Sequence, residues 1–310
     1  MSTLKDIGER GIIERLCRRL PSRPEVALGV GDDCAIVRPG ATPDCEWLLT
    51  SDAVIEGTHF TGGASPAAVG HKAIGRVLSD LAAMGAEPRW ALMDLAAPPH
   101  EEVRILEGIY EGATALAARH ALAIVGGDTA RADALAIHVF AVGQAPANKS
   151  VRRSGARKGD LVFVTGALGG SRRCRHLAFE PRVQEGIWLR DWAAALIDVS
   201  DGLAADLRHI LDQSGVGATL DGSRIPVSAD ARELNDGVPP LDHALYDGED
   251  FELLFTVRPD HEAALLEAWR STFTLPCTCI GVMTDRPGVL ECVGRGGAVT
   301  VLEEPGFRHF

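Results

Sequence analysis

The hydrophobic positions follow helical and strand-like spacing in alternation along the chain. Residues 66–84 carry an apolar stripe at three- and four-residue intervals, with Pro66 at the start and Gly85 just past the end, which predicts an amphipathic helix. Shorter apolar runs bounded by glycine and acidic residues are typical of strands. We expect further helices over 4–20, 99–120, from Gly202 to about 211 and near 260–271. We expect strands over 27–31, 47–55, 90–97, 122–125, 134–142, 161–165, near 218 and over 253–257, and several short strands after the last helix.

This alternation predicts an α/β fold, with α+β layers in each half of the chain. Residues 148–160 (NKSVRRSGARKGD) interrupt the pattern with charge and glycine, as a boundary between domains often does. With 310 residues, of which 46% are hydrophobic, the chain is long enough for two domains with buried cores. We therefore expect domains at 1–147 and 148–310.

Composition narrows the choice of partner and compartment. The formal charge is −12, and neither basic runs nor interleaved aromatics occur, which argues against a nucleic-acid or anionic-membrane partner. No apolar run approaches the roughly 20 residues of a spanning helix, and the N-terminus does not resemble a signal peptide. Seven scattered cysteines without zinc-type spacing favour free thiols. A cytoplasmic protein is therefore expected.

Acidic residues recur where the predicted strands end, most of them beside glycine. Within residues 195–209, Asp198 and Asp201 flank Ser200 at a strand-to-helix junction. Such a junction can hold a metal-bound phosphate, although helix capping explains Ser200 or Asp201 about equally well. Four other stretches carry a carboxylate of the same kind, at Asp32, Asp52, Asp80 and Asp128.

Asp80 is the least expected of these acids, because it lies on or beside the apolar stripe of its helix and in the last turn, where the helix dipole disfavours an anion. It therefore needs a cation, for which Arg76 and a metal ion are the two candidates. If all six carboxylates converge, they require cations to stay ionised. Oxygen ligands favour Mg²⁺, and Mg²⁺ that shares its shell with phosphate indicates handling of a nucleoside triphosphate.

Seven motifs occur in a fixed order, and they are GVGDD (29–33), TSD (50–52) with EGTHF (56–60), LSDLAAMGA (78–86), GGDT (126–129), RSGA (153–156), DVSDGL (198–203) and GEDFEL (248–253). In order and spacing they resemble the thiamine-monophosphate kinase family, which belongs to the superfamily of aminoimidazole ribonucleotide synthetase. The resemblance implies a homodimer of two-domain chains with the fold of that superfamily. The N-terminal domains would pair through a shared β-barrel, with ATP bound in a cleft near that interface.

The resemblance also implies a reaction and its residues. The reaction is ATP-dependent phosphorylation of thiamine monophosphate to thiamine diphosphate, by in-line transfer with several Mg²⁺ ions. Domain 1–147 would bind ATP and Mg²⁺ and dimerise, and domain 148–310 would complete the site. The magnesium positions would be Asp32, Thr50, Ser51, Asp52, Asp80, Asp128, Asp198 and Asp201. The ATP positions would be Tyr110, Gly127, Asp128, Arg153 and Ser200. The thiamine positions would be His59, Glu249 and Phe307.

No catalytic base is assigned, because a phosphate monoester is already a nucleophile at neutral pH. Two alternatives stay open. A non-catalytic paralogue could bind ATP or a thiamine phosphate without transfer, which the segment 168–195, shorter than is typical of the family, would permit. Another ATP-dependent member of the superfamily is the second, although relatives with a reactive cysteine near one terminus fit poorly. The chain ends in Phe310, and its first cysteine, Cys17, lies in a predicted helix.

Overall fold

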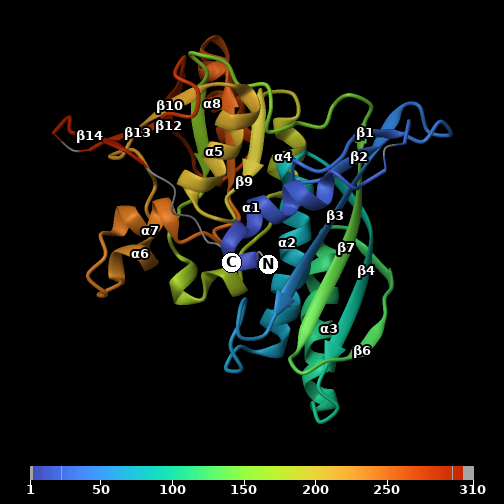
Figure 1. The fold of residues 1–310 in the computed structure, drawn as a ribbon. Coiled ribbons are helices and arrows are strands. Elements are labelled where there is room, and N and C mark those ends of the chain that lie inside the picture. Colours follow the sequence, from blue (N-terminus) through green and yellow to red (C-terminus); the bar gives the residue numbers. More distant parts are fainter. Residues whose placement is uncertain (1–2, 22, 295, 303–310) are drawn as a thin grey trace.

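Two seven-stranded sheets, one from each half of the chain, form the framework of the computed structural model, which describes residues 3–21, 23–294 and 296–302 (Figure 1). The first sheet has the order β1-β2-β3-β7-β4-β5, with β6 paired to β4. Its strands are β1 (Val26–Leu28), β2 (Ala35–Val37), β3 (Cys45–Ile55), β4 (Glu87–Ala97), β5 (Ala123–Gly126), β6 (Thr129–Arg131) and β7 (Ala136–Pro146).

The second sheet has the order β14-β13-β10-β12-β8-β11-β9. Because β9 and β11 are buried along their whole lengths, every residue of both strands is apolar except Asp198 and Thr256. The strands are β8 (Leu161–Thr165), β9 (Ala195–Asp198), β10 (Gly217–Asp221), β11 (Leu253–Val257), β12 (Cys277–Thr284), β13 (Leu290–Val293) and β14 (Val299–Val301).

The helices are arranged around these sheets. In the first half, α2 (Pro66–Ala83) and α3 (Val103–Arg119) lie against one face of the first sheet (Figure 1). In the second half, α5 lies against the second sheet and α8 contributes Leu265 and Trp269 to a core shared with Phe163 and Phe255. The remaining bounds are α1 (Leu4–Cys17), α4 (Val183–Leu189), α5 (Leu203–Ser214), α6 (Ala229–Glu233), α7 (Pro240–Tyr246) and α8 (Glu262–Thr272), with 3₁₀ turns η1 (Ser171–Arg173), η2 (Arg175–Leu177) and η3 (Pro259–His261).

Helix α2 is buried on several sides because it contacts both halves of the chain. It crosses α3 through two glycines: a Cβ on Gly70 would lie 1.8 Å from the Ile109 carbonyl oxygen, and one on Gly112 would lie 1.8 Å from that of Ala67. On the second half, α4 comes equally close, since a Cβ on Gly186 would lie 2.1 Å from the Ala82 oxygen. Only glycine permits such approaches, so α2 is held between the two halves.

The other face of the first sheet carries apolar side chains that no described helix covers. The strands β3, β4 and β7 are eleven residues long and antiparallel, and their alternation points Trp90, Leu92 and Phe140 away from α2. Trp90 is 46% exposed and stacks on Trp47 with ring centroids 5.3 Å apart. Within the single chain the described strands form an open sheet, so a shared barrel would need a second chain.

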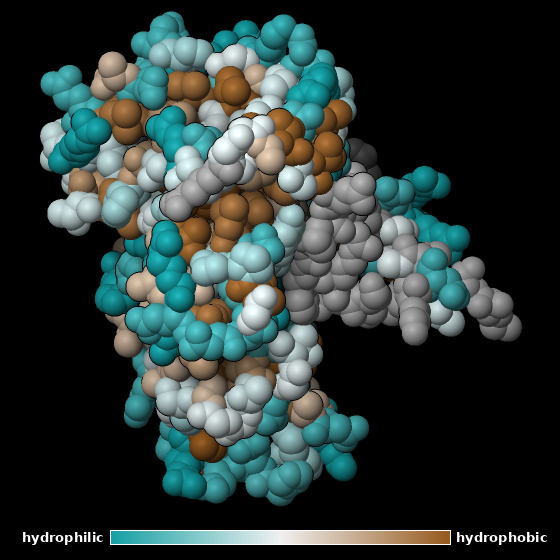
Figure 2. Space-filling model, turned by 90° about the vertical axis from the view of Figure 1, so that its left-hand side faces the viewer, coloured by the Kyte–Doolittle hydropathy of each residue, from teal (hydrophilic) through white to brown (hydrophobic). Residues whose placement is uncertain are grey.

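The surface is mixed on the side that carries β14, α6 and α7. Figure 2 shows largely hydrophilic residues along the lower edge of this face, with hydrophobic residues gathered in the upper half. None of the described helices combines the length and the apolar character that crossing a membrane requires.

Most predicted elements form near their expected bounds, and the differences have local causes. The strand predicted over 27–31 ends at Leu28, three residues before Gly31, whose φ of 130° turns the backbone in a way that only glycine adopts readily. The helix predicted over 4–20 ends at Cys17 and is broken at Gly8, whose φ is 65°. The strands β2 and β6 and the helices α4, α6 and α7 were not predicted, since each is short.

Candidate functional site

Two loops of the second half close on each other at the end of β9. Asp198 is the last residue of β9 and pairs with Leu253 of β11. Just beyond, the N–H of Glu249 donates to the Ser200 carbonyl at 2.7 Å. At Gly202 the φ of 115° turns the chain into α5, which begins one residue later. The motifs at 198–203 and 248–253 are therefore adjacent in space.

The centre of the site is a cluster of carboxylates drawn from both halves of the chain. Oxygen atoms of Asp33, Asp80 and Asp198 lie within 4.8 Å of one another. Helix α2 supplies two consecutive contacts, because the Ser79 hydroxyl donates to Asp198 at 2.5 Å while Asp80 accepts a short hydrogen bond from Thr50. The residue that looked misplaced on the apolar stripe of α2 thus faces the other acids.

Burial sets the protonation of this cluster. It raises the pKa of Asp80 well above the usual range, and the charges of Asp52 and Asp198 add to the effect. Burial and the charge of Asp33 raise the pKa of Asp198 to about 7, and the same two causes raise that of Asp32 to about 7. A bound cation would stabilise the ionised form of these carboxyls, because it replaces the hydration that they lose on burial.

Arg153 supplies one such cation, at the edge of the cluster. Its guanidinium forms an ion pair with Asp33 at 2.6 Å, and the backbone N–H of Arg153 donates to Asp32 at 3.2 Å. One guanidinium cannot compensate all of these carboxyls once they ionise. The remaining donors are carboxylate and hydroxyl oxygens, the ligands that Mg²⁺ prefers, so the residues fit a magnesium site.

A second group of side chains surrounds the start of α5. Ligand atoms of Asp201, Asp206 and His209 lie within 4.8 Å of one another. The buried Asp206 accepts the N–H groups of Asp201 at 3.0 Å and Gly202 at 3.1 Å, which holds the loop in place. Burial and the charge of Asp201 raise the pKa of Asp206 well above its usual range. A residue that the motif analysis did not assign thus holds the loop that carries Asp201.

Strand β3 separates three neighbouring residues that the motifs grouped together. Thr50 and Asp52 point toward α2, whereas Ser51 is exposed on the opposite face, as strand alternation requires. Arg76 of α2 forms its ion pair with Asp52, at 2.7 Å. Of the two cation partners considered for Asp80, the arginine is therefore bonded to a different carboxylate.

Glu249, which was assigned to the thiamine substrate, belongs to a charged network beside α2. Glu249 contacts the Lys72 ammonium at 2.5 Å and the His176 ring at 3.3 Å. Lys72 is fully buried and also donates to the His59 carbonyl at 2.7 Å. The His59 ring is buried too, and its Nδ1 accepts the N–H of Ile55 at 3.0 Å. Phe307 lies outside the described residues.

Three residues assigned to ATP line a separate hollow of about 420 Å³ where β5 ends. Tyr110 and Gly127 lie on its wall, and Asp128 is exposed at it. A Cβ on Gly127 would lie 2.0 Å from the Met93 carbonyl oxygen, so this position requires glycine. The Asp128 N–H donates to Asp94 at 2.8 Å, which fixes the turn.

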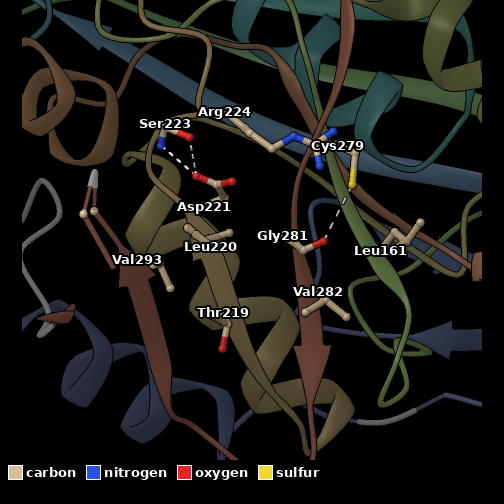
Figure 3. A pocket seen from close by; sticks show the side chains of 12 residues that line it. Leu161, Thr219, Leu220, Asp221, Ser223, Arg224, Cys279, Gly281, Val282 and Val293 are labelled. Carbon is tan, nitrogen blue, oxygen red and sulfur yellow. Dashed lines mark hydrogen bonds between the residues drawn. The ribbon is translucent and has the colours of Figure 1, made fainter. Parts of the chain in front are cut away.

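A larger hollow of about 700 Å³ lies on the second sheet, but its chemistry is less suited to phosphate transfer. Figure 3 shows its floor on β10 and β12, with Arg224 beside Cys279. The acid that lines it, Asp221, accepts hydrogen bonds from Ser223 across a short turn. The carboxylate cluster is therefore the better candidate.

Comparison with known proteins settles the family. Two family models match, those of the N-terminal domain of AIR synthase related protein, over residues 31–145, and of its C-terminal domain, over residues 181–292. A curated thiamine-monophosphate kinase from Rhodopirellula baltica is 38% identical to the chain, over 97% of the length of each protein. One from Salmonella typhimurium is 37% identical, over 98% of the length of each. The chain belongs to the thiamine-monophosphate kinase family.

Solved structures agree with this membership. A structure described as AaThiL complexed with AMPPCP and TMP is 32% identical and has a TM-score of 0.86, over 100% of this chain and 99% of that one. Thiamine-monophosphate kinase from Stenotrophomonas maltophilia K279a is 35% identical, with a TM-score of 0.75 over 93% and 96%. The predictions of the family, of its fold and of a kinase are confirmed. HypE of E. coli, 21% identical with a TM-score of 0.72, shares the fold alone.

Within this thiamine-monophosphate kinase family member, the motifs led to most of the central residues but missed Asp206 and three others. Asp33 was passed over in favour of Asp32, although both belong to the same GDD triplet. Lys72 and His176 carried no motif signal, because their role depends on a contact with Glu249 from a distant segment. Lys72 lies at the flank of the apolar stripe of 66–84, and its complete burial is visible only in the structure.

We predict that Mg²⁺ stabilises the protein more at about pH 8 than at about pH 6. The pKa of Asp32 and of Asp198 is about 7 in the folded state, so each binds a proton there that the unfolded chain, with a pKa near 3.8, releases. Their stabilising contribution is complete below that unfolded pKa and is lost as pH rises through about 7. Melting temperatures measured with and without Mg²⁺ at both pH values test this prediction.

The Asp198→Asn variant is the control, because its amide is uncharged at both pH values. It should show a smaller Mg²⁺-induced rise in melting temperature at about pH 8 than the wild type. Equal Mg²⁺ effects at the two pH values in the wild type would contradict the assigned protonation.

Proposed function

We propose that the chain transfers the γ-phosphoryl group of ATP to thiamine monophosphate, giving thiamine diphosphate and ADP. The observation that carries this proposal is the cluster of Asp33, Asp80 and Asp198, which joins both halves of a kinase-family chain in one buried group of oxygen ligands. Bound Mg²⁺ would supply charge neutralisation for two polyanions. The chain's own task is then to hold the phosphates in line and to exclude water.

The residues fall into three proposed groups. Those that would hold Mg²⁺ are Asp32, Thr50, Asp52, Asp80, Asp128, Asp198 and Asp201, to which the geometry adds Asp33. The motifs also assigned Ser51, but its side chain is exposed on the opposite face of β3 from Thr50 and Asp52. Those that would contact ATP are Tyr110, Gly127, Asp128, Arg153 and Ser200. Arg153 supports this role because its guanidinium is held at the cluster by Asp33, where a transferring phosphoryl group would develop charge.

The thiamine side is proposed at His59, Glu249 and Phe307. Glu249 lies at the mouth of the network with 29% of its side chain exposed, so its charge can attract the cationic thiazolium ring. The His59 ring is held by the Ile55 N–H, which orients it rather than preparing it as a base. No base is needed, because the acceptor phosphate carries its own nucleophilic oxygen.

The uncovered apolar face of the first sheet supports a homodimer. Trp90, Leu92 and Phe140 lie together on it, and a second copy would bury them, in line with the shared barrel that the motifs imply. Residues 1–147 would then be the dimerising domain and 148–310 the completing one. All seven cysteines are free thiols, and ATP is an intracellular substrate, so we place the protein in the cytoplasm.

The direct test is turnover. Purified protein with Mg²⁺ and ATP should convert thiamine monophosphate to the diphosphate, and Asp80→Asn and Asp201→Asn should each lower kcat on the order of a hundredfold or more. The physical reason is that each substitution removes a charged oxygen ligand without changing side-chain size. Product formation is measured by chromatography of the thiamine phosphates.

The matched control is Asp285→Asn, which removes an exposed carboxylate paired with Lys158. Its turnover should equal that of the wild type. ATP binding without product in the wild type would sink the kinase assignment and favour a paralogue that only binds its ligands. Unchanged turnover of both site variants would show that the metal assignment is wrong.

The dimer is tested by Trp90→Glu. A charge in the centre of the apolar face should shift the protein to monomers, measured by size-exclusion chromatography with light scattering. Val103→Glu is the control, because Val103 is also exposed but lies at the start of α3. A monomeric wild type, or a Trp90→Glu variant as dimeric as the wild type, would contradict this interface.

A further inference from the structure

Two cations stand one helical turn apart on α2 and reach the same carboxylate. Lys72 and Arg76 are four residues apart, and both contact Glu249, the lysine at 2.5 Å and the arginine at 3.7 Å. Their surroundings differ. The Lys72 side chain has no exposed surface, whereas 16% of the Arg76 side chain is exposed. A ligand that enters between the two halves can therefore reach the guanidinium but not the ammonium.

Lys72 has no donor to spare. Its ammonium carries three hydrogens, and the structure gives it three neighbours: the His59 carbonyl at 2.7 Å, Glu249 at 2.5 Å and the His176 Nδ1 at 2.6 Å. These contacts tie three separate segments to α2. The lysine is thus a structural cation within the network.

Arg76 has donors left over. Of its five N–H groups, one is directed to Asp52 at 2.7 Å, and the contact to Glu249 at 3.7 Å is longer than a hydrogen bond. Its Nε is buried and has no hydrogen-bond partner among the described residues. A buried donor without a partner is unfavourable, so an additional acceptor at this guanidinium would be stabilising.

The position of Arg76 matches one part of the proposed substrate. It stands between Asp52, assigned to Mg²⁺ and hence to the ATP side, and Glu249, assigned to the thiazolium. The acceptor phosphate of thiamine monophosphate must bridge these two sides. A planar guanidinium can bind two oxygens of a phosphate at once, which lysine does not do.

The charges around Arg76 also favour a bound phosphate. Lys72 and Arg76 face Glu249 and Asp52, so the four charges balance. A divalent cation on Asp52 would take up its carboxylate oxygens and leave the arginine to another anion. A phosphate monoester supplies that anion in the required position.

We propose that Arg76 binds the phosphate group of thiamine monophosphate and so selects the phosphorylated form of the substrate. This inference rests on the proposed function and adds a residue to it. Arg76 forms no covalent bond in the reaction. It fixes the acceptor oxygen in line and offsets the repulsion between two phosphates.

Isothermal titration calorimetry tests the proposal on the full chain with Mg²⁺ and AMPPCP present. Arg76→Met should weaken binding of thiamine monophosphate about tenfold or more, while affinity for thiamine, which lacks the phosphate, changes less than about twofold. Arg76→Lys keeps the charge but not the planar guanidinium, so its affinity for thiamine monophosphate should lie between those of the wild type and Arg76→Met. Arg104→Met, which removes an exposed arginine paired with Glu102, should match the wild type.

Metal binding gives a readout independent of substrate. Because Arg76 competes for Asp52, Arg76→Met should bind Mn²⁺, used as a probe for Mg²⁺, at least as tightly as the wild type in the absence of nucleotide. Weaker Mn²⁺ binding would mean that the arginine holds the carboxylates in place, and would overturn the assigned role.

The outcomes separate the inference from the function on which it rests. The role of Arg76 alone would be overturned if both Arg76 variants bound thiamine monophosphate as tightly as the wild type does. It would also be overturned if the variants lost equal affinity for thiamine and for thiamine monophosphate. No binding by the wild type would overturn the proposed function as well. Circular dichroism checks the fold, and if Arg76→Met does not fold, Arg76→Lys decides by the same comparison.

Discussion

The burial of α2 between the two halves of the chain is the constraint on which the site depends. Glycines at both of its contacts let backbone approach backbone, at Gly70 toward α3 and at Gly186 from α4. Because α2 is fixed on both sides, the polar groups along it meet fixed partners. Ser79 reaches Asp198 of the second sheet while Asp80 reaches Thr50 of the first. One helix thus sets the relative position of both sets of ligands.

The same burial makes the site electrostatically unstable by itself. Carboxyls removed from water keep their protons to higher pH, as the raised pKa values of Asp80 and Asp198 indicate. Arg153 and Arg76 each compensate one carboxylate at the margin, Asp33 and Asp52 respectively. The centre of the cluster is left to a cation that the chain does not provide. In this reading, the binding free energy of Mg²⁺ offsets the cost of bringing the acids together.

The sequence predicted the parts of this arrangement that depend on local pattern. Helical periodicity placed α2 within a residue of its observed end, and the acids at strand ends belong to motifs that identified the family. Strand alternation explains why Thr50 and Asp52 share a face and Ser51 does not. Contacts between segments that are distant in the sequence could not be predicted from local pattern. Arg76 was considered beside Asp80 because they are neighbours on one helix, yet its partner comes from β3.

A divalent cation should join carboxylates of the two halves. Anomalous diffraction from crystals grown with Mn²⁺ and AMPPCP can detect it. We expect a manganese peak about 2 to 2.5 Å from oxygens of both Asp80 and Asp198. Bound AMPPCP with ordered carboxylates and no metal between these two residues would contradict it.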